Sequence, residues 1–502
     1  MRPHPPQSHP VPGPRRIDAP PAAPTLRATL VMALATALLT MGALRAAPVA
    51  PEILPDPFIP GFHFPESEAT VTSWITEMTR GRTAAGRTAA AEKIFLHGWG
   101  LWAALTTETA QVYEGQRLRV FETWLTADDL TEYPTLRSVD AVAQLTRRRA
   151  PLKTIDQLRE FDHGTVEPTQ STPGIATPAT PRVVGFVKYD PTAAEHIIRQ
   201  ELLSIAALNT LVQGGAQQIP AFPATALVVK PLFQVIKAKD LIDHRYYALK
   251  VWPGPPEIPQ AVPPAQWPGT VWIDVLEGGA GRGAIDGAAA ADGSTRSDGT
   301  TYPLSSLIHY RLSAVDAAML NTDKPGTEAN AGDFAILVAM HVSGREITRW
   351  TWQTFWWTPT PGDPRAPSSP AIAGLRPNQL RGAARNYAMA LAYTMLTPDQ
   401  PHVGGENAGA AVYAYNPWIE ARFAPADLPD SLPGRDPNDE PAGNNYGIQT
   451  NCMSCHAQAS YNPNRLLTAP RFTGARYVDL ADPKFLGTLQ VDFLWSVARH
   501  AK

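Results

Sequence analysis

The residues with the most distinctive chemistry in this 502-residue chain are Cys452 and Cys455, followed directly by His456. The cysteines occupy positions i and i+3, so one turn of helix would bring both thiols to the same side, next to the imidazole. They are the only two cysteines of the chain. The sequence therefore has no disulfide framework and no second pair for a four-thiolate zinc or iron–sulfur site.

The run Cys-Met-Ser-Cys-His resembles the haem-attachment motif of c-type cytochromes, and the resemblance covers this motif only. It implies one covalently bound haem c, carried by Cys452 and Cys455, with His456 as the axial ligand of the iron. A Cys-x-x-Cys redox pair and a zinc site completed by histidines are alternative interpretations. Haem is attached to such motifs outside the cytoplasm, so a signal for export would favour haem.

The N-terminus carries such a pattern. Arg15, Arg16 and Arg27 precede an uncharged, largely apolar run of 17 residues, 28–44, and small residues follow at Ala46 and Ala47. We expect 1–47 to be a signal peptide or an N-terminal anchor, and the protein to be periplasmic or otherwise exported. The run is at the short limit of a membrane span, and 28–44 is the only possible membrane tether in the sequence.

The second axial position of the iron is not assigned by the motif. Only 46 residues follow His456, and none of them is a methionine. An empty position is one possibility, and the candidate ligands are His500 downstream and Met340, His341, Met389, Met395 and His402 upstream. Side chains that could contact the haem are the tryptophans Trp350, Trp352 and Trp356 and, for the propionates, Arg465, Arg471 and Arg476.

Composition limits the remaining function classes. The formal net charge is −3 and charged residues make up 18 % of the chain, so no nucleic-acid partner is expected. Proline is the outlier, because 51 prolines are about twice the usual share of roughly 5 %. Proline interrupts helices and central strands, which predicts many loops and short elements.

The elements that must position the motif divide into three regions after residue 47. We expect a helical N-terminal region over 48–163, a β-rich body over 183–423 with a mobile segment at 278–301, and a haem-binding segment over 440–502 packed on the body. The predicted fold is α+β, with a mainly antiparallel sheet, flanking helices and many proline-rich loops, and with the haem-binding segment at the C-terminus.

Local patterns within these regions predict individual elements. A helix pair is expected over 66–106, a strand over 183–189, and one long helix capped by Asp190 and ended by Gly214. Three strands are expected in 224–276, and a hairpin over 334–357 turning at Ser343 and Gly344. A short helix is expected around 386–396.

The leading functional interpretation is an exported c-type cytochrome that acts in electron transfer with a redox partner of unknown identity. A haem enzyme of peroxidase or oxygenase type, with an open sixth iron site, is the second, because the chain is far larger than an electron carrier needs to be. The third is a binding or sensor protein that contains haem.

Overall fold

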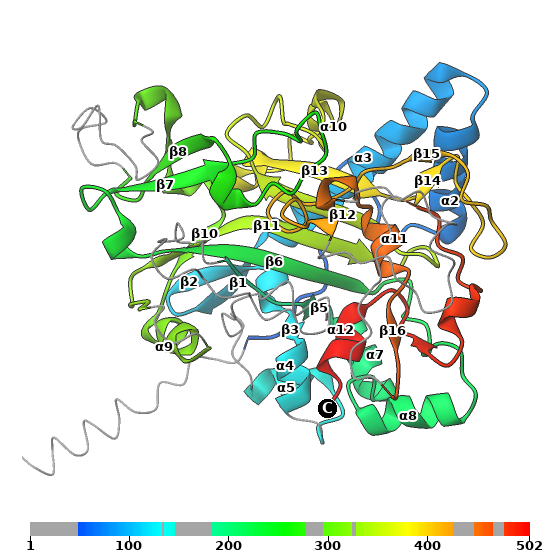
Figure 1. Cartoon of the computed structure of the whole chain (residues 1–502). Helices are drawn as coiled ribbons and strands as arrows, with labels where there is room; N and C mark the ends of the chain where they lie inside the picture. Colours follow the sequence, from blue (N-terminus) through cyan, green and yellow to red (C-terminus); the bar gives the residue numbers. More distant parts are fainter. Residues whose placement is uncertain are drawn as a thin grey trace, which may run out of the picture. The chain divides into compact units, whose positions relative to one another are not determined.

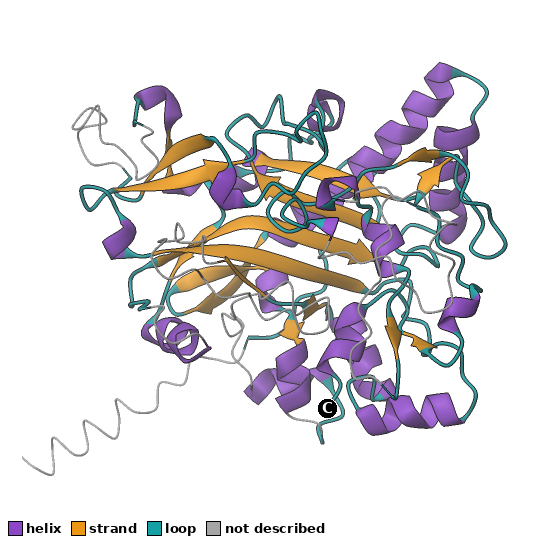
Figure 2. Ribbon diagram, viewed as in Figure 1, coloured by secondary structure: helices purple, strands orange, loops and turns teal. Residues whose placement is uncertain are grey.

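The computed structural model describes residues 49–132, 135–145, 183–277, 295–323, 328–425, 446–464 and 476–502 (Figure 1). The expectations for 1–47, for most of the segment 278–301, and for Arg465 and Arg471 lie outside these residues. The described chain is an α+β protein whose strands pair mainly antiparallel, which confirms the predicted fold class (Figure 2). In the described ranges, no helix is long and apolar enough to cross a membrane.

One sheet dominates the described structure. Its main strand order is β13-β12-β11-β6-β5-β3, with β10 pairing to β11 and β4 pairing to β6. The strands of this sheet are β3 Leu125–Thr126, β4 Val183–Gly185, β5 Lys188–Tyr189, β6 Leu227–Ile236, β10 His309–Arg311, β11 Phe334–Gly344, β12 Thr351–Trp357 and β13 Tyr387–Ala392. Smaller sheets are formed by β1 Glu108–Tyr113 with β2 Gln116–Arg119, by β7 Tyr246–Val251, β8 Gly269–Asp274 and β9 Thr301–Pro303, by β14 Leu396–Thr397 with β15 Ala410–Ala411, and by β16 Ser460–Tyr461 with β17 Leu489–Gln490.

The helices are grouped by sequence into an N-terminal, a central and a C-terminal set. They are α2 Glu68–Arg80, α3 Ala84–Thr106, α4 Ala127–Glu132, α5 Val139–Leu145, α7 Pro191–Gln200, α8 Ile205–Gln213, α9 Ala314–Asp323, α10 Pro370–Gly374, α11 Cys452–His456 and α12 Trp495–His500. The pair α2 and α3 confirms the helix pair expected over 66–106.

The register of the sheet fixes which side chains share a face. His341 on β11 is paired with Lys230 on β6 and with Thr354 on β12. Met340 is paired with Phe355, and Phe355 with Met389 on β13. Since successive residues of a strand point to opposite faces, the His341 row and the Met340 row face opposite sides of the sheet.

Helix α3 covers the Met340 face. The ring of Trp102 stacks on that of Phe355 with centroids 4.3 Å apart. A Cβ built at Gly98 would meet the Met389 sulfur at 2.7 Å, so a larger residue there would require the Met389 side chain to move. The opposite face of the sheet, which carries His341, is the one that reaches the C-terminal segment.

Three local expectations are corrected. The expected hairpin exists, but β11 continues through Ser343 and Gly344, and Gly344 pairs with Thr351. The turn is therefore the six-residue loop 345–350. Ser343 is buried, and its hydroxyl donates a hydrogen bond to the Val228 carbonyl, so the pair continues the strand and does not form an exposed turn.

The long helix expected after Asp190 is two helices. The Asp190 side chain caps α7 by accepting hydrogen bonds from the Ala193 and Thr192 amides, and Gly214 ends α8, both as predicted. Between them Glu201 adopts a left-handed backbone with φ of 52°, and Ser204 caps α8. The apolar stripe continues through this break, which is why the sequence pattern resembles that of a single helix.

The helix expected around 386–396 is instead β13. Its alanines favour helix locally, but all six residues pair with β12, and pairing within a buried sheet overrides such weak propensities.

Candidate functional site

The motif Cys452 to His456 forms the short helix α11, which is fixed at its first turn by Asn451. This fully buried side chain accepts a hydrogen bond from the Ser454 amide at 3.0 Å. Its Nδ2 donates to the carbonyls of Val412, at 2.8 Å, and Thr394, at 3.2 Å. Asn451 thus satisfies the helix end and ties α11 to the segment that follows β13.

His456 is held in one orientation by the chain that precedes α12. Its Nδ1 lies 2.8 Å from the Phe493 carbonyl oxygen. A carbonyl can only accept, so Nδ1 carries the proton and the lone pair is on Nε2. This is the tautomer that a histidine needs in order to bind a metal through Nε2, with the second nitrogen anchored to the protein. The Trp352 ring packs on the imidazole with centroids 4.1 Å apart.

The two cysteines are partly exposed and carry neutral thiols. Burial raises the pKa of the Cys452 thiol well above its ordinary value, and Glu420 and Cys455 add to the effect. Burial and Glu420 raise the pKa of Cys455 to about 12, against an opposing contribution from Lys230. A dithiol redox pair reacts through a thiolate, which this environment disfavours in the metal-free chain.

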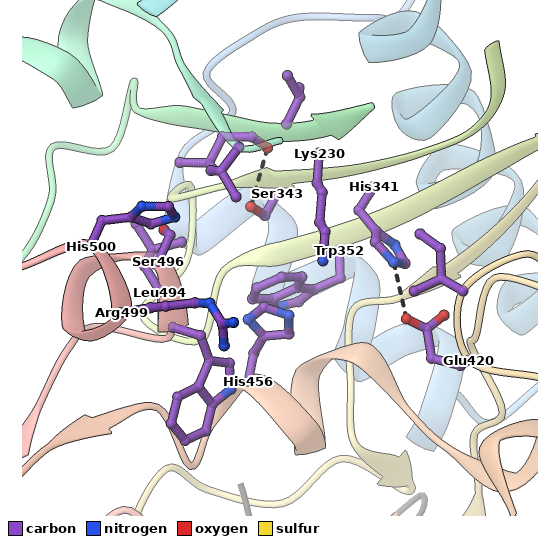
Figure 3. Close-up of a pocket in the computed structure, with 15 residues that line it drawn as sticks. Lys230, His341, Ser343, Trp352, Glu420, His456, Leu494, Ser496, Arg499 and His500 are labelled. Carbon is purple, nitrogen blue, oxygen red and sulfur yellow. Dashed lines mark hydrogen bonds and ion pairs between the residues drawn. The ribbon is translucent and has the colours of Figure 1, made fainter. Parts of the chain in front are cut away.

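A cavity of about 90 Å³, open to solvent in part, lies beside His456 (Figure 3). Its sheet wall includes Val228, Lys230, His341, Ser343 and Trp352, and its C-terminal wall includes Leu494, Trp495, Ser496, Arg499 and His500.

A second cavity, of about 40 Å³, shares part of its lining with the first and is lined by both cysteines together with Asn451, Thr450 and Phe423. His341, Trp352, Glu420 and His456 line both cavities. The two thiols and the imidazole thus border neighbouring cavities, and the main one also touches the sheet and α12. The donor set and the tautomer of His456 fit a haem attached through the motif.

The structure divides the candidates for a second axial ligand. His341 and His500 line the main cavity. Met340 and Met389 are fully buried on the α3 face of the sheet, so the register directs them away from it. Met395 is also fully buried, and its sulfur accepts a hydrogen bond from the Val478 amide. His402 is not among the lining residues, and burial followed by Arg349 lowers its pKa.

The remaining predicted contacts are separated by the structure. Trp352 lines the cavity, whereas Trp350 precedes β12 with φ of 61° and packs against Phe222. Trp356 is buried but does not line it. Of the predicted propionate partners only Arg476 lies in the described residues, and its carbonyl accepts a hydrogen bond from the Ser454 hydroxyl.

Three charged residues of the site were not anticipated from sequence: Lys230, Glu420 and Arg499. Glu420 holds the imidazole of His341, with Oε1 3.1 Å from Nε2, and its Oε2 accepts a hydrogen bond from the Asn416 amide at 2.6 Å. One signal was present, because Lys230 is the only charged residue of the largely apolar strand β6.

In the described part of the chain, no three His, Cys, Asp or Glu side chains gather as a bare metal ion would require. Comparisons with protein-family models, with curated protein sequences and with solved structures find no match to this chain.

Proposed function

We propose that this protein is an exported c-type cytochrome that carries one haem covalently, through Cys452 and Cys455 with His456 as axial ligand, and acts in electron transfer. The observation that carries the proposal is the geometry of His456. Its Nδ1 is anchored to the Phe493 carbonyl, which leaves the lone pair on Nε2, and both thiols lie in the adjoining cavity.

The chain's own residues would position and insulate the group. Bound haem iron would supply a one-electron couple, whose potential depends on ligand basicity, burial and neighbouring charge. The hydrogen bond to Phe493 makes the imidazole of His456 a stronger donor to a metal. Val228, Leu494 and Trp352 give the cavity an apolar lining that limits water.

Haem attachment is tested by making the mature chain together with a cytochrome maturation system and staining denaturing gels for haem. The full chain should stain, and the Cys452→Ala, Cys455→Ala double variant should not. Met453→Leu is the matched control, because it changes a buried motif residue of similar volume without removing a thiol or the ligand, and it should stain. Covalent haem that persists in the double variant would refute the assignment.

Export is proposed from the arginines and the apolar run of residues 28–44. Mature protein should be recovered from the periplasm, either with its N-terminus at about residue 47 or 48 or still tethered by 28–44. Recovery from the cytoplasm with residue 1 intact would contradict this.

A haem enzyme is the second candidate, and one observation favours it. The His341 imidazole, hydrogen-bonded to Glu420, faces the same cavity as His456, and such a pair can hold or move a proton beside a small bound molecule. Optical spectra of the ferrous protein with and without carbon monoxide separate the two functions. No spectral change supports electron transfer, whereas carbon monoxide binding indicates an open site.

A further inference from the structure

The wall that α12 contributes to the main cavity contains a buried donor without a partner. Nε1 of Trp495 is shielded from solvent and has no hydrogen-bond partner among the described residues. Buried polar groups are usually satisfied, so this donor can serve an acceptor bound in the cavity that Trp495 lines. Arg499 and His500 line the same wall, and both can donate to an anion.

The smaller cavity and the main cavity are lined by different kinds of side chain. Both cysteines line the smaller cavity, and no residue of α12 does so. The α12 residues line the main cavity, which contains no cysteine. His456 borders both cavities, and in Figure 3 it lies between the His341–Glu420 pair on one side and Arg499 and His500 on the other.

Haem likewise carries different groups on its two edges. Its two vinyl groups, which thiols attack, and its two carboxylates lie on opposite edges of the ring, with the iron between them. Thiols at one end and an axial histidine in the middle therefore direct the carboxylates toward α12. Lys230 also lines the main cavity, but it belongs to the sheet wall, whereas Arg499 lies on α12 with the unpartnered Nε1 of Trp495.

We infer that α12 is the carboxylate-binding wall of the cavity, with Arg499 and the Nε1 of Trp495 as the principal donors and His500 beside them. This inference rests on the proposed function and adds a binding subsite to it. It adds α12 to the arginines after the motif as an expected partner of the haem carboxylates; of these arginines, Arg465 and Arg471 lie outside the described residues. The planar guanidinium of Arg499 suits a carboxylate because it can donate two parallel hydrogen bonds.

The test uses two haems that cannot form thioethers, since ethyl groups replace their vinyl groups: mesohaem, which has free carboxylates, and its dimethyl ester. Binding of each to the mature full chain, made without maturation proteins, is measured by titration of the Soret band. Arg499→Gln should weaken mesohaem binding about tenfold to a hundredfold and change ester binding less than twofold. Trp495→Phe should show the same selectivity with a smaller loss, and Arg499→Lys should fall between wild type and Arg499→Gln.

Arg199→Gln is the matched control, because this exposed arginine of α7 does not line the main cavity. It should bind both haems as the wild type does. Equal weakening of both haems by Arg499→Gln, or no weakening of either, would overturn the inference. If the wild type binds mesohaem and its ester equally while the matured protein stains for haem, the inference fails and the proposed function stands. Binding of neither haem by the wild type, together with no haem staining, would refute both.

Discussion

At the scale of single residues, the loop between β11 and β12 is fixed by one buried carboxylate. Glu346 Oε1 lies 3.0 Å from Nε2 of His97 and also accepts a hydrogen bond from the Glu66 amide. Its Oε2 accepts from the Thr351 hydroxyl. Both side chains of the His97–Glu346 pair are inaccessible to solvent, so water cannot take the place of either hydrogen-bond partner if the other residue is substituted. The pair belongs to the α3 face, away from the cavity.

Removing this carboxylate should therefore be costly. We expect Glu346→Ala to lower the free energy of unfolding by about 3–5 kcal/mol, because the buried His97 and Thr351 and the partly buried Glu66 amide lose their acceptor at once. Glu195→Ala, which breaks the exposed pair with Arg199, should cost less than about 1 kcal/mol. Urea unfolding followed by tryptophan fluorescence measures both. A loss at Glu346 no larger than that at Glu195 would show that the network contributes little to stability.

Only part of the candidate site could be predicted from residue types and their spacing. Cys452, Cys455 and His456 are recognisable from spacing alone, since the three side chains belong to one turn of helix. His341 was one of six equal candidates for the second ligand, because only the strand register separates its face from that of Met340 and Met389. Glu420 and Arg499 were missed because they reach the cavity from segments that no local pattern connects to the motif.

At the scale of elements, capping residues in the sequence correctly predicted where helices begin and end. Asp190 and Pro191 mark the start of α7, and Gly214 marks the end of α8. The break at Glu201 and the strand β13 depend on packing partners that are distant in sequence, so periodicity alone could not place them. The turn at 345–350 was misplaced for the same reason, because the buried Glu346 holds the loop through His97 of α3.

The cap of α7 predicts a dependence of stability on pH. Burial raises the pKa of Asp190 to about 6, whereas the unfolded value is about 3.9. The folded state therefore binds this proton more tightly. The resulting stabilisation is complete below about pH 4 and is lost as the pH rises through about 6.

In Asp190→Asn this titration is absent, while Oδ1 can still accept from the Ala193 and Leu227 amides. Relative to the variant, the wild type should lose about 2–3 kcal/mol of stability between pH 4 and pH 7. Urea midpoints across this range provide the measurement. Asp243→Asn, at an exposed position, is the control and should keep the wild-type pH profile. Parallel profiles for the wild type and Asp190→Asn would contradict the prediction.

At the scale of the whole described structure, the candidate site is assembled from segments that are far apart in sequence. Lys230 and His341 come from the central sheet, Glu420 from the segment after β15, and His456 and Arg499 from the C-terminal segment. The sheet wall of the cavity is already ordered by its pairing within the large sheet. The C-terminal residues contribute the motif and one wall, but they do not enclose the cavity alone.

This division leads to a prediction about the fragment 440–502. A chain of 63 residues must offset about 1–2 kcal/mol of backbone entropy per ordered residue, and the main apolar residues available for this are those around Phe485 to Val497. Three of its most buried residues, Met453, Val491 and Val497, belong to a core that also contains Ile197 and Trp352 from the rest of the protein. The fragment lacks these partners.

Expressed alone with the maturation machinery, the fragment can present the attachment motif and so can acquire covalent haem. It should nevertheless melt without cooperativity, and its ferric and ferrous spectra should differ from those of the full chain, because the sheet wall with His341 and Trp352 is missing. Mixing with a second fragment that spans 48–439 should restore the parent spectrum if the two parts dock as in the intact chain. A fragment that unfolds cooperatively and reproduces the parent spectrum by itself would show that the C-terminus is an independent cytochrome module, and the sheet would then have no part in the haem site.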